Sequence, residues 1–217
     1  METQSIKPPL ATAIYGGHEA FAHRLLLDSR IDMTAENSDH AHPLLWAAWA
    51  GCPSILQILL RNRNVDVNLE GNFGFTALHY AVEQGHLSVV QHLLEYDIDI
   101  NRTDDNGLTP LWKAISKGRK KIAHYLLAID MVKLNVVGED GSTSLHYAAW
   151  RGQLSIVNAL LLHSHIDMNA QNNTGSTALH CAVAQGHLSV VQRLLEDDID
   201  INCVNKGSHS PSPGQSL

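Results

Sequence analysis

Histidine is the residue with the clearest capacity to bind a metal ion or transfer a proton in this chain, which contains 14 copies. A zinc site needs three or four ligands that converge on one point. Six of these histidines instead recur singly, either three residues after a threonine or directly after a glycine; they are His79, His146, His180, His18, His86 and His187. His163 and His165 form one isolated pair. We therefore predict structural histidines, no metal site and no cofactor.

Catalytic signatures are missing from the sequence. It contains no phosphate-binding glycine loop, HExxH helix, CxxC pair or GxSxG turn. Glu83 would serve as an acid or base if burial raised its pKa, yet nothing in the sequence converges on it. Cys52, Cys181 and Cys203 are an odd number in unrelated contexts, which argues against a disulfide framework and favours a reducing compartment. We predict that the chain is not an enzyme.

Charge and hydrophobicity exclude several classes of partner. The formal net charge is −7, which argues against nucleic acid and anionic membrane surfaces, because both need clustered Lys and Arg. The first residues lack the pattern of a signal peptide, and no apolar stretch is long enough to span a bilayer. The sequence therefore predicts an intracellular protein, cytoplasmic or nuclear.

A repeat positions these residues. Glycines recur with successive spacings of 34, 34, 33, 34 and 34 residues; they are Gly17, Gly51, Gly85, Gly118, Gly152 and Gly186. A period of this size indicates a repeat architecture in which each unit packs only against its neighbours.

The unit that begins at Thr76 shows the pattern best. Thr76 is a good N-cap, and residues 77–84 are predicted to form a short helix that Gly85 ends. Residues 87–95 are predicted to form a second helix with one apolar side. Neither helix is long enough to be stable alone, so stacked units must bury the apolar sides.

The threonine motif carries a family resemblance. It occurs as Thr76-Ala77-Leu78-His79, Thr109-Pro110-Leu111-Trp112, Thr143-Ser144-Leu145-His146 and Thr177-Ala178-Leu179-His180, with weaker versions at His42-Pro43-Leu44-Leu45 and Pro8-Pro9-Leu10-Ala11. The chain resembles ankyrin-repeat proteins, in particular the long arrays of filamentous fungi. The resemblance implies an all-α solenoid of stacked helix-turn-helix units with β-turn fingers, in which the motif histidine makes hydrogen bonds within and between units. Trp112, Leu45 and Ala11 replace that histidine, so these bonds are not expected there.

The expected organisation is one array over residues 1–205, followed by a disordered tail or truncated seventh unit over 206–217. The units fall at about 7–39, 40–73, 74–106, 107–140, 141–174 and 175–205. A shift of 101 residues superimposes 76–101 on 177–202 with 22 of 26 positions identical, which indicates duplication of a three-unit block. The sixth unit keeps Val190, Val191, Leu194 and Leu195, so its edge is a candidate for self-association.

The resemblance also implies where a partner binds: against the finger tips and the first helices, on the concave side. The matching residues are Tyr15, Trp49, Phe73, Phe75, Glu83, Gln84, Leu108, Lys117, Trp150, Arg151 and Gln185. Trp, Tyr and Arg dominate interface energies. We predict Trp49, Phe73, Phe75 and Trp150 as anchors, with Glu83, Lys117 and Arg151 setting orientation. The alternative is that these rings pack between neighbouring units and stiffen the array.

The predicted function is a non-catalytic scaffold that binds another protein or peptide in a concave, aromatic-rich groove. One alternative is a small-molecule-binding protein or cofactor-free enzyme that uses the groove as an apolar pocket. Another is a regulatory subunit or transcription co-regulator. Lys117, Arg119, Lys120 and Lys121 form a basic cluster, which is either a solvated convex face or a docking site for an acidic peptide.

Overall fold

The computed structural model describes residues 8–34, 42–197 and 199–206, and within these residues the chain is helical without a β-strand. Most of the tail expected over 206–217 lies outside the described residues. The helices are α1 (Pro9–Tyr15), α2 (Glu19–Leu26), α3 (Pro43–Ala50), α4 (Pro53–Arg61), the 3-10 helix η1 (Asn72–Gly74), α5 (Ala77–Gln84), α6 (Leu87–Leu93), α7 (Pro110–Ser116), α8 (Lys120–Leu127), α9 (Ser144–Trp150), α10 (Leu154–Leu161), α11 (Ala178–Ala184) and α12 (Leu188–Leu195). The predicted all-α class is confirmed.

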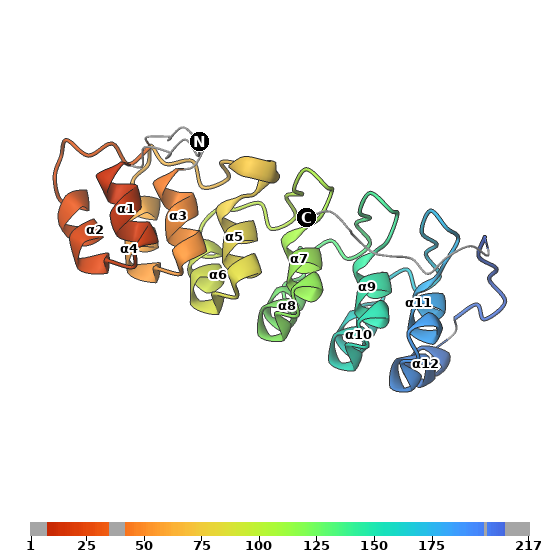
Figure 1. Ribbon diagram of the computed structural model, residues 1–217. Coiled ribbons are helices and arrows are strands. Elements are labelled where there is room, and N and C mark those ends of the chain that lie inside the picture. The colour runs from red at the N-terminus through yellow and green to blue at the C-terminus, as the bar shows by residue number, and fades with distance from the viewer. Residues whose placement is uncertain (1–7, 35–41, 198, 207–217) are drawn as a thin grey trace, which may run out of the picture. The chain divides into compact units, whose positions relative to one another are not determined.

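The chain forms two compact units, unit 1 (residues 1–105) and unit 2 (residues 106–217). In unit 1 the first helices of the repeats, α1, α3 and α5, pack side by side, and the second helices α2, α4 and α6 form a layer behind them (Figure 1). Unit 2 repeats this arrangement with α7, α9 and α11 in one layer and α8, α10 and α12 in the other (Figure 1). The single array over residues 1–205 and its unit boundaries stay predictions.

A threonine and a histidine start the first helices. The Thr76 hydroxyl lies 2.9 Å from Nδ1 of His79, and the two residues form a reciprocal capping box that is fully buried. The same box recurs in α9 and α11. At α7 the Thr109 hydroxyl still accepts the backbone N–H of Trp112 at 3.3 Å. The indole N–H of Trp112, however, has no acceptor among the described residues, so the expected loss of the histidine bonds is confirmed at this one position.

The second helices bury one side against their neighbours. Val89, Val90 and Leu93 of α6 are fully buried, as the apolar spacing predicts. The helix ends at Leu93, before the expected Glu95, because the last turn tightens and the Glu95 N–H donates to the His92 carbonyl, three residues back.

The fingers are joined by backbone hydrogen bonds. In unit 1 the carbonyl of Phe73 accepts the N–H of Asp105 at 3.0 Å. In unit 2 the equivalent carbonyls of Asp140 and Thr174 accept the N–H groups of Asn173 and Lys206 at 3.0 and 2.9 Å. Each bond ties one finger to the next and fixes where the finger side chains lie.

Candidate interaction surface

A stacked aromatic pair lies on the first helices of unit 1. Tyr15 is the last residue of α1, and Trp49 lies one repeat later on α3. Their rings are parallel within 4°, with centroids 4.6 Å apart. Tyr15 is 51% exposed and Trp49 is half-buried, so the pair presents apolar surface to solvent while each ring supports the other.

The backbone that carries Trp49 is fixed by the following repeat. The Trp49 carbonyl lies 3.1 Å from Nε2 of His86, the residue after the glycine that ends α5. Gly51 has a left-handed backbone with φ of 72°, and a Cβ atom there would lie 2.5 Å from the His86 ring. A glycine is therefore required at this position both for its conformation and for the close approach of the imidazole.

Phe73 and Phe75 have opposite surroundings, although the sequence predicts the same anchor role for both. Phe73 is 70% exposed and lies at the tip of a finger. Phe75 is only 9% exposed, and its ring contacts His79 and Tyr80 with centroids 5.6 and 5.2 Å away. The expectation that Phe75 is exposed is wrong, because its ring fills the space between the finger and α5 and therefore has a folding role.

Phe73 also has unusual backbone geometry. Its φ of 62° makes it the one non-glycine residue with positive φ among those the structure describes. Such a conformation costs about 1–2 kcal/mol for an L-residue with a side chain. An exposed aromatic ring at a strained position contributes little to folding, which suggests another role.

Unit 2 carries a larger cluster in which an arginine covers aromatic rings. The Tyr147 ring contacts Trp112 and Trp150, with centroids 4.6 and 5.5 Å away. The Arg151 guanidinium lies 5.6 Å from the ring centroids of both Tyr147 and Trp150. Tyr147 and Trp112 are buried, whereas Trp150 is half-buried and Arg151 is exposed. The alternative that the rings pack between repeats therefore holds for Tyr147 and Trp112. It holds only in part for Trp150, because part of that ring is exposed to solvent.

The Trp150 helix end is fixed in the same way as that of Trp49. Its carbonyl lies 2.9 Å from Nε2 of His187, and a Cβ on Gly152 would lie 2.6 Å from the same imidazole. One repeat earlier, Gln153 uses its side-chain N–H₂ to donate to the Ile115 carbonyl at 2.9 Å. The sequence shows histidines after the glycines, but this link between repeats is seen only in the structure, and its one signal in the sequence is the fixed position of those histidines.

The remaining predicted residues lie at the ends of first helices or in a finger. Glu83 and Gln84 end α5 and are half-buried, as is Leu108 in the finger before α7. Lys117 and Gln185 are exposed C-cap residues of α7 and α11. The structure thus places all of them on the first-helix and finger side of their own unit, and their role in binding stays a prediction.

The titratable groups behave as structural groups. Burial lowers the pKa of His146, which favours its neutral form, and its Nε2 lies 2.9 Å from the Ser176 carbonyl in the next finger. Burial, with a smaller contribution from Asp140, raises the pKa of the Cys181 thiol to about 12. Cys181 is therefore protonated at neutral pH and is a poor nucleophile. Within the described ranges, no three His, Cys, Asp or Glu side chains are grouped so that they could hold a metal ion.

Comparison with known families accounts for this architecture. A family model for three copies of the ankyrin repeat matches residues 63–136, 78–172 and 129–205, and a single-repeat model matches 39–72. The chain belongs to the ankyrin-repeat family. Ankyrin repeats are protein-interaction modules, so the family supports a protein-interaction scaffold.

Relatives of this ankyrin-repeat chain match it over short segments. Inversin from Danio rerio is 40% identical over 52 residues, and BCL-6 corepressor from Homo sapiens is 44% identical over 50 residues. These segments are 24% and 23% of this chain, but only 5% and 3% of the two relatives. The crystal structure of the ankyrin-repeat domain of Bcl-3, a member of the IkappaB family, matches with a TM-score of 0.81 and 26% identity, covering 96% of this chain and 93% of that domain.

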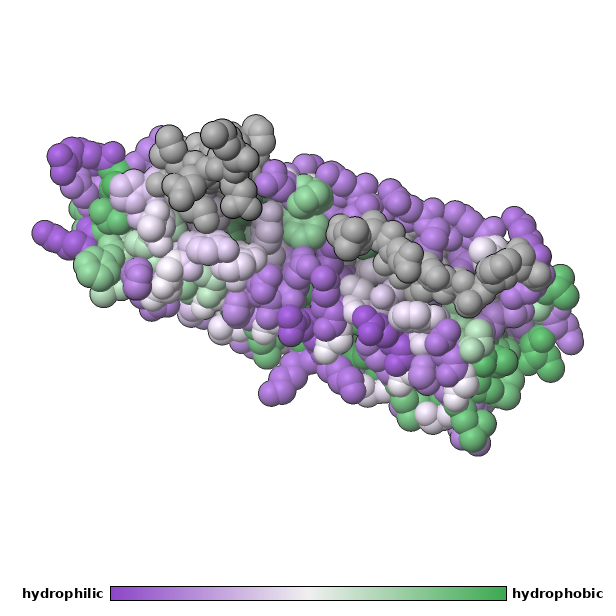
Figure 2. Space-filling model, viewed as in Figure 1, coloured by the Kyte–Doolittle hydropathy of each residue, from purple (hydrophilic) through white to green (hydrophobic). Residues whose placement is uncertain are grey.

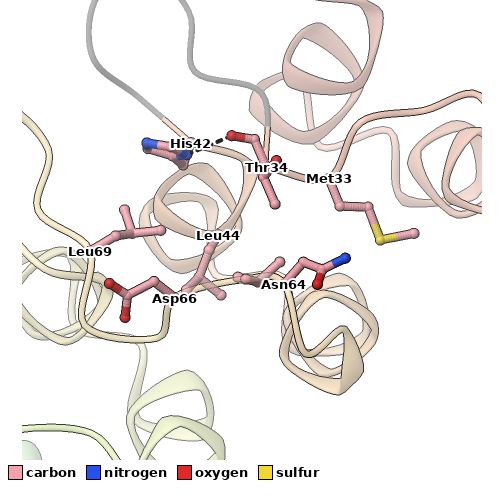
Figure 3. Close-up of a pocket in the computed structure, with 8 residues that line it drawn as sticks. Met33, Thr34, His42, Leu44, Asn64, Asp66 and Leu69 are labelled. Carbon is pink, nitrogen blue, oxygen red and sulfur yellow. Dashed lines mark hydrogen bonds between the residues drawn. The ribbon is translucent and has the colours of Figure 1, made fainter.

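A cavity of about 260 Å³ lies in unit 1 of the ankyrin-repeat chain (Figure 3). Its lining is mixed: Met33, Thr34, His42, Leu44, Asn64, Val65, Asp66 and Leu69. Nδ1 of His42 lies 3.0 Å from the Thr34 carbonyl at its edge. None of these residues is a predicted interface residue, so this cavity is not the aromatic pocket that the small-molecule alternative requires.

Apolar side chains gather at the end of unit 2 that carries α12 (Figure 2). Val190 and Leu194 of the predicted edge are fully buried, and Leu195 is 51% exposed. Further exposed apolar side chains, which the sequence did not single out, belong to α11, to α12 and to the segment after α12: Val183, Leu188, Ile201 and Val204. Separately, no helix among the described residues is long and apolar enough to cross a membrane.

Proposed function

We propose that this ankyrin-repeat protein is a non-catalytic scaffold that binds a partner protein through exposed side chains on its first helices and fingers. The anchors are Tyr15, Trp49 and Phe73 in unit 1 and Trp150 in unit 2. Glu83, Lys117 and Arg151 set the orientation of the partner. Phe75 is removed from the anchors that the sequence suggests, because its ring is buried.

The observation that carries this proposal is the Tyr15–Trp49 pair. Two large rings stack at 4.6 Å, and Tyr15 remains 51% exposed. Hydrogen bonding of the Trp49 carbonyl to His86 fixes the helix end beneath the pair. A rigid, partly exposed aromatic surface loses little conformational entropy on binding, which is how interface anchors contribute most of their energy.

The test is affinity capture from a source extract, read by mass spectrometry, with the wild type beside the Trp49→Ala/Trp150→Ala variant. We expect at least one protein to be retained by the wild type and lost from the variant. Circular dichroism should show unchanged helicity in the variant, because both rings are only half-buried and both helix ends are bonded through backbone carbonyls.

A matched control is Leu162→Ala, which truncates an 84%-exposed apolar side chain after α10. This variant should capture the same proteins as the wild type. Equal capture by the double tryptophan variant would refute the anchor roles, and loss of helicity in that variant would show that the rings serve the fold.

Self-association through the apolar end of unit 2 is a second candidate function. Leu188 is 67% exposed and Val183 is 60% exposed, although both lie on helices that pack within unit 2. Exposed apolar side chains that gather in a patch are typical of protein interaction sites. We expect light scattering at rising protein concentration to show a mass above the monomer, and Leu188→Glu to restore the monomer. A wild type that stays monomeric throughout contradicts this candidate.

A further inference from the structure

We infer that the first-helix side of unit 2 binds an acidic peptide segment of the partner protein, with Lys117 and Arg151 contacting its carboxylates and Trp150 contacting an apolar side chain. This inference rests on the proposed function, and it adds the chemical class of the partner at one of the two units.

The first helices of unit 2 are purely cationic. Counting C-cap residues, α7, α9 and α11 carry the buried Lys113, the exposed Lys117 and Arg151, and no Asp or Glu. No Asp or Glu lies within any helix from α7 to α12, so the acidic residues of unit 2 are confined to its fingers and turns. This local excess of positive charge stands out in a chain whose formal net charge is −7.

The Arg151 side chain is fixed by a hydrogen bond and by two aromatic rings. One guanidinium N–H donates to the Ser116 carbonyl at 2.7 Å, at the C-terminal end of α7, where the helix dipole favours a cation. The guanidinium also lies over Tyr147 and Trp150, 5.6 Å from each ring centroid. The side chain is nevertheless exposed. An arginine fixed in this way has donors left for a carboxylate, which guanidinium binds with two parallel hydrogen bonds.

Lys117 and Arg151 occupy equivalent positions at the ends of adjacent helices. Both are exposed C-cap residues, Lys117 of α7 and Arg151 of α9. Two cations displayed one repeat apart suit an extended segment that carries successive acidic residues. The half-buried ring of Trp150, beside Arg151, adds apolar contact that a free anion would not use.

A peptide fits these observations better than a nucleic acid. The basic residues on the second helix α8, Lys120 and Lys121, are exposed, but they lie in the other helix layer and do not extend the first-helix surface. Eight acidic residues in the loops of unit 2 leave it with a formal charge of only +1, far from the strongly basic character of nucleic-acid-binding domains.

The experiment measures fluorescence polarisation of a short labelled peptide that alternates Glu with Leu and Tyr, titrated with the full chain. A peptide with Gln in place of Glu and a labelled single-stranded DNA oligonucleotide are the comparison probes. We expect the Glu peptide to bind about tenfold more tightly than the Gln peptide, and its affinity to fall as salt rises.

Two variants that each remove one positive charge locate the site. Arg151→Gln should weaken binding of the Glu peptide about tenfold, because a specific contact is lost. Lys121→Gln removes the same charge from α8 and should change the affinity by less than about twofold. If Arg151→Gln unfolds, as circular dichroism would show, Lys117→Gln provides the same test.

The outcomes separate this inference from the proposed function. Equal weakening by Arg151→Gln and Lys121→Gln, equal affinity for the Glu and Gln peptides, or tighter binding of the oligonucleotide would each overturn the inference. In those cases, capture that still depends on Trp49 and Trp150 would leave the proposed function standing. Capture that is unaffected by the tryptophan variant refutes the proposed function, whatever the peptide result.

Discussion

The two units share one scaffold and differ in the charge they carry on it. Residues 76–101 of unit 1 and 177–202 of unit 2 are identical at 22 of 26 positions. Yet unit 1 has six basic and fourteen acidic residues, a formal charge of −8, whereas unit 2 has nine basic and eight acidic residues, a charge of +1. On the first helices and their C-caps the contrast is sharper, because Glu83 is the one Asp, Glu, Lys or Arg residue in unit 1, whereas unit 2 has the buried Lys113 and the exposed Lys117 and Arg151.

This difference separates residues that build the repeats from residues that are available for recognition. His86 and His187 occur at the same place in both units, and each bonds the carbonyl of the tryptophan-bearing helix one repeat earlier. The residues at the ends of those same helices vary in charge. Two repeat blocks that keep the structural histidines and vary the residues at the helix ends can present two different binding surfaces.

The largest expected effect tests whether both units depend on the same glycine–histidine contact. Gly152→Ala should lower the free energy of unfolding by about 2–3 kcal/mol, because alanine is strained at positive φ and its Cβ would push the His187 ring off the Trp150 carbonyl. Gly51→Ala should do the same in unit 1, where the added Cβ would lie 2.5 Å from the His86 ring. Urea unfolding followed by circular dichroism measures both.

Gly186→Ala is the matched control for this contact. Gly186 has the same left-handed conformation, with φ of 72°, but a Cβ there would meet no atom within 4 Å. Its substitution should cost only the conformational term, about 1–2 kcal/mol. Equal losses at Gly152 and Gly186 would show that the imidazole contributes nothing to the effect.

A smaller effect concerns the histidine that links fingers in unit 2. His146→Gln should lower the free energy of unfolding at neutral pH by about 1–3 kcal/mol, because the Thr143 and Ser176 partners of this buried group lose their bonds. The folded-state pKa of His146 is lowered, so its contribution is complete above the unfolded value of 6.5 and is lost as pH falls through the folded value.

The variant should therefore show a flatter decline of stability than the wild type as pH falls below 6.5. Urea unfolding at several pH values, with the His146 imidazole followed by NMR, measures this. A His146 resonance that titrates at or above the ordinary histidine pKa would contradict the cause we assign.

The repeat architecture could be predicted from the sequence because its determinants are local. Thr76 with His79, and the periodic apolar residues of α6, fix helix starts and buried sides within one unit. The surroundings of the candidate anchors could not be predicted, because they depend on packing between repeats. Phe73 and Phe75 are two positions apart in the chain, but only the three-dimensional structure shows that Phe75 packs on His79 and Tyr80 while Phe73 is exposed.

The smallest expected change in stability comes from replacing Phe73 in the finger of unit 1. The equivalent fingers of unit 2 make the same carbonyl bond through Asp140 and Thr174 without positive φ, so the strain at Phe73 is not needed for the scaffold. Phe73→Asn should leave the free energy of unfolding unchanged or raise it by about 0.5 kcal/mol, since asparagine tolerates this conformation and the ring is mostly exposed. Capture of the partner should nevertheless weaken, because the exposed ring is gone. The Phe73 ring lies edge-on to that of Phe75, with centroids 6.3 Å apart. A loss of stability above about 1 kcal/mol would mean that this contact outweighs the strain, and that Phe73 belongs to the fold of unit 1.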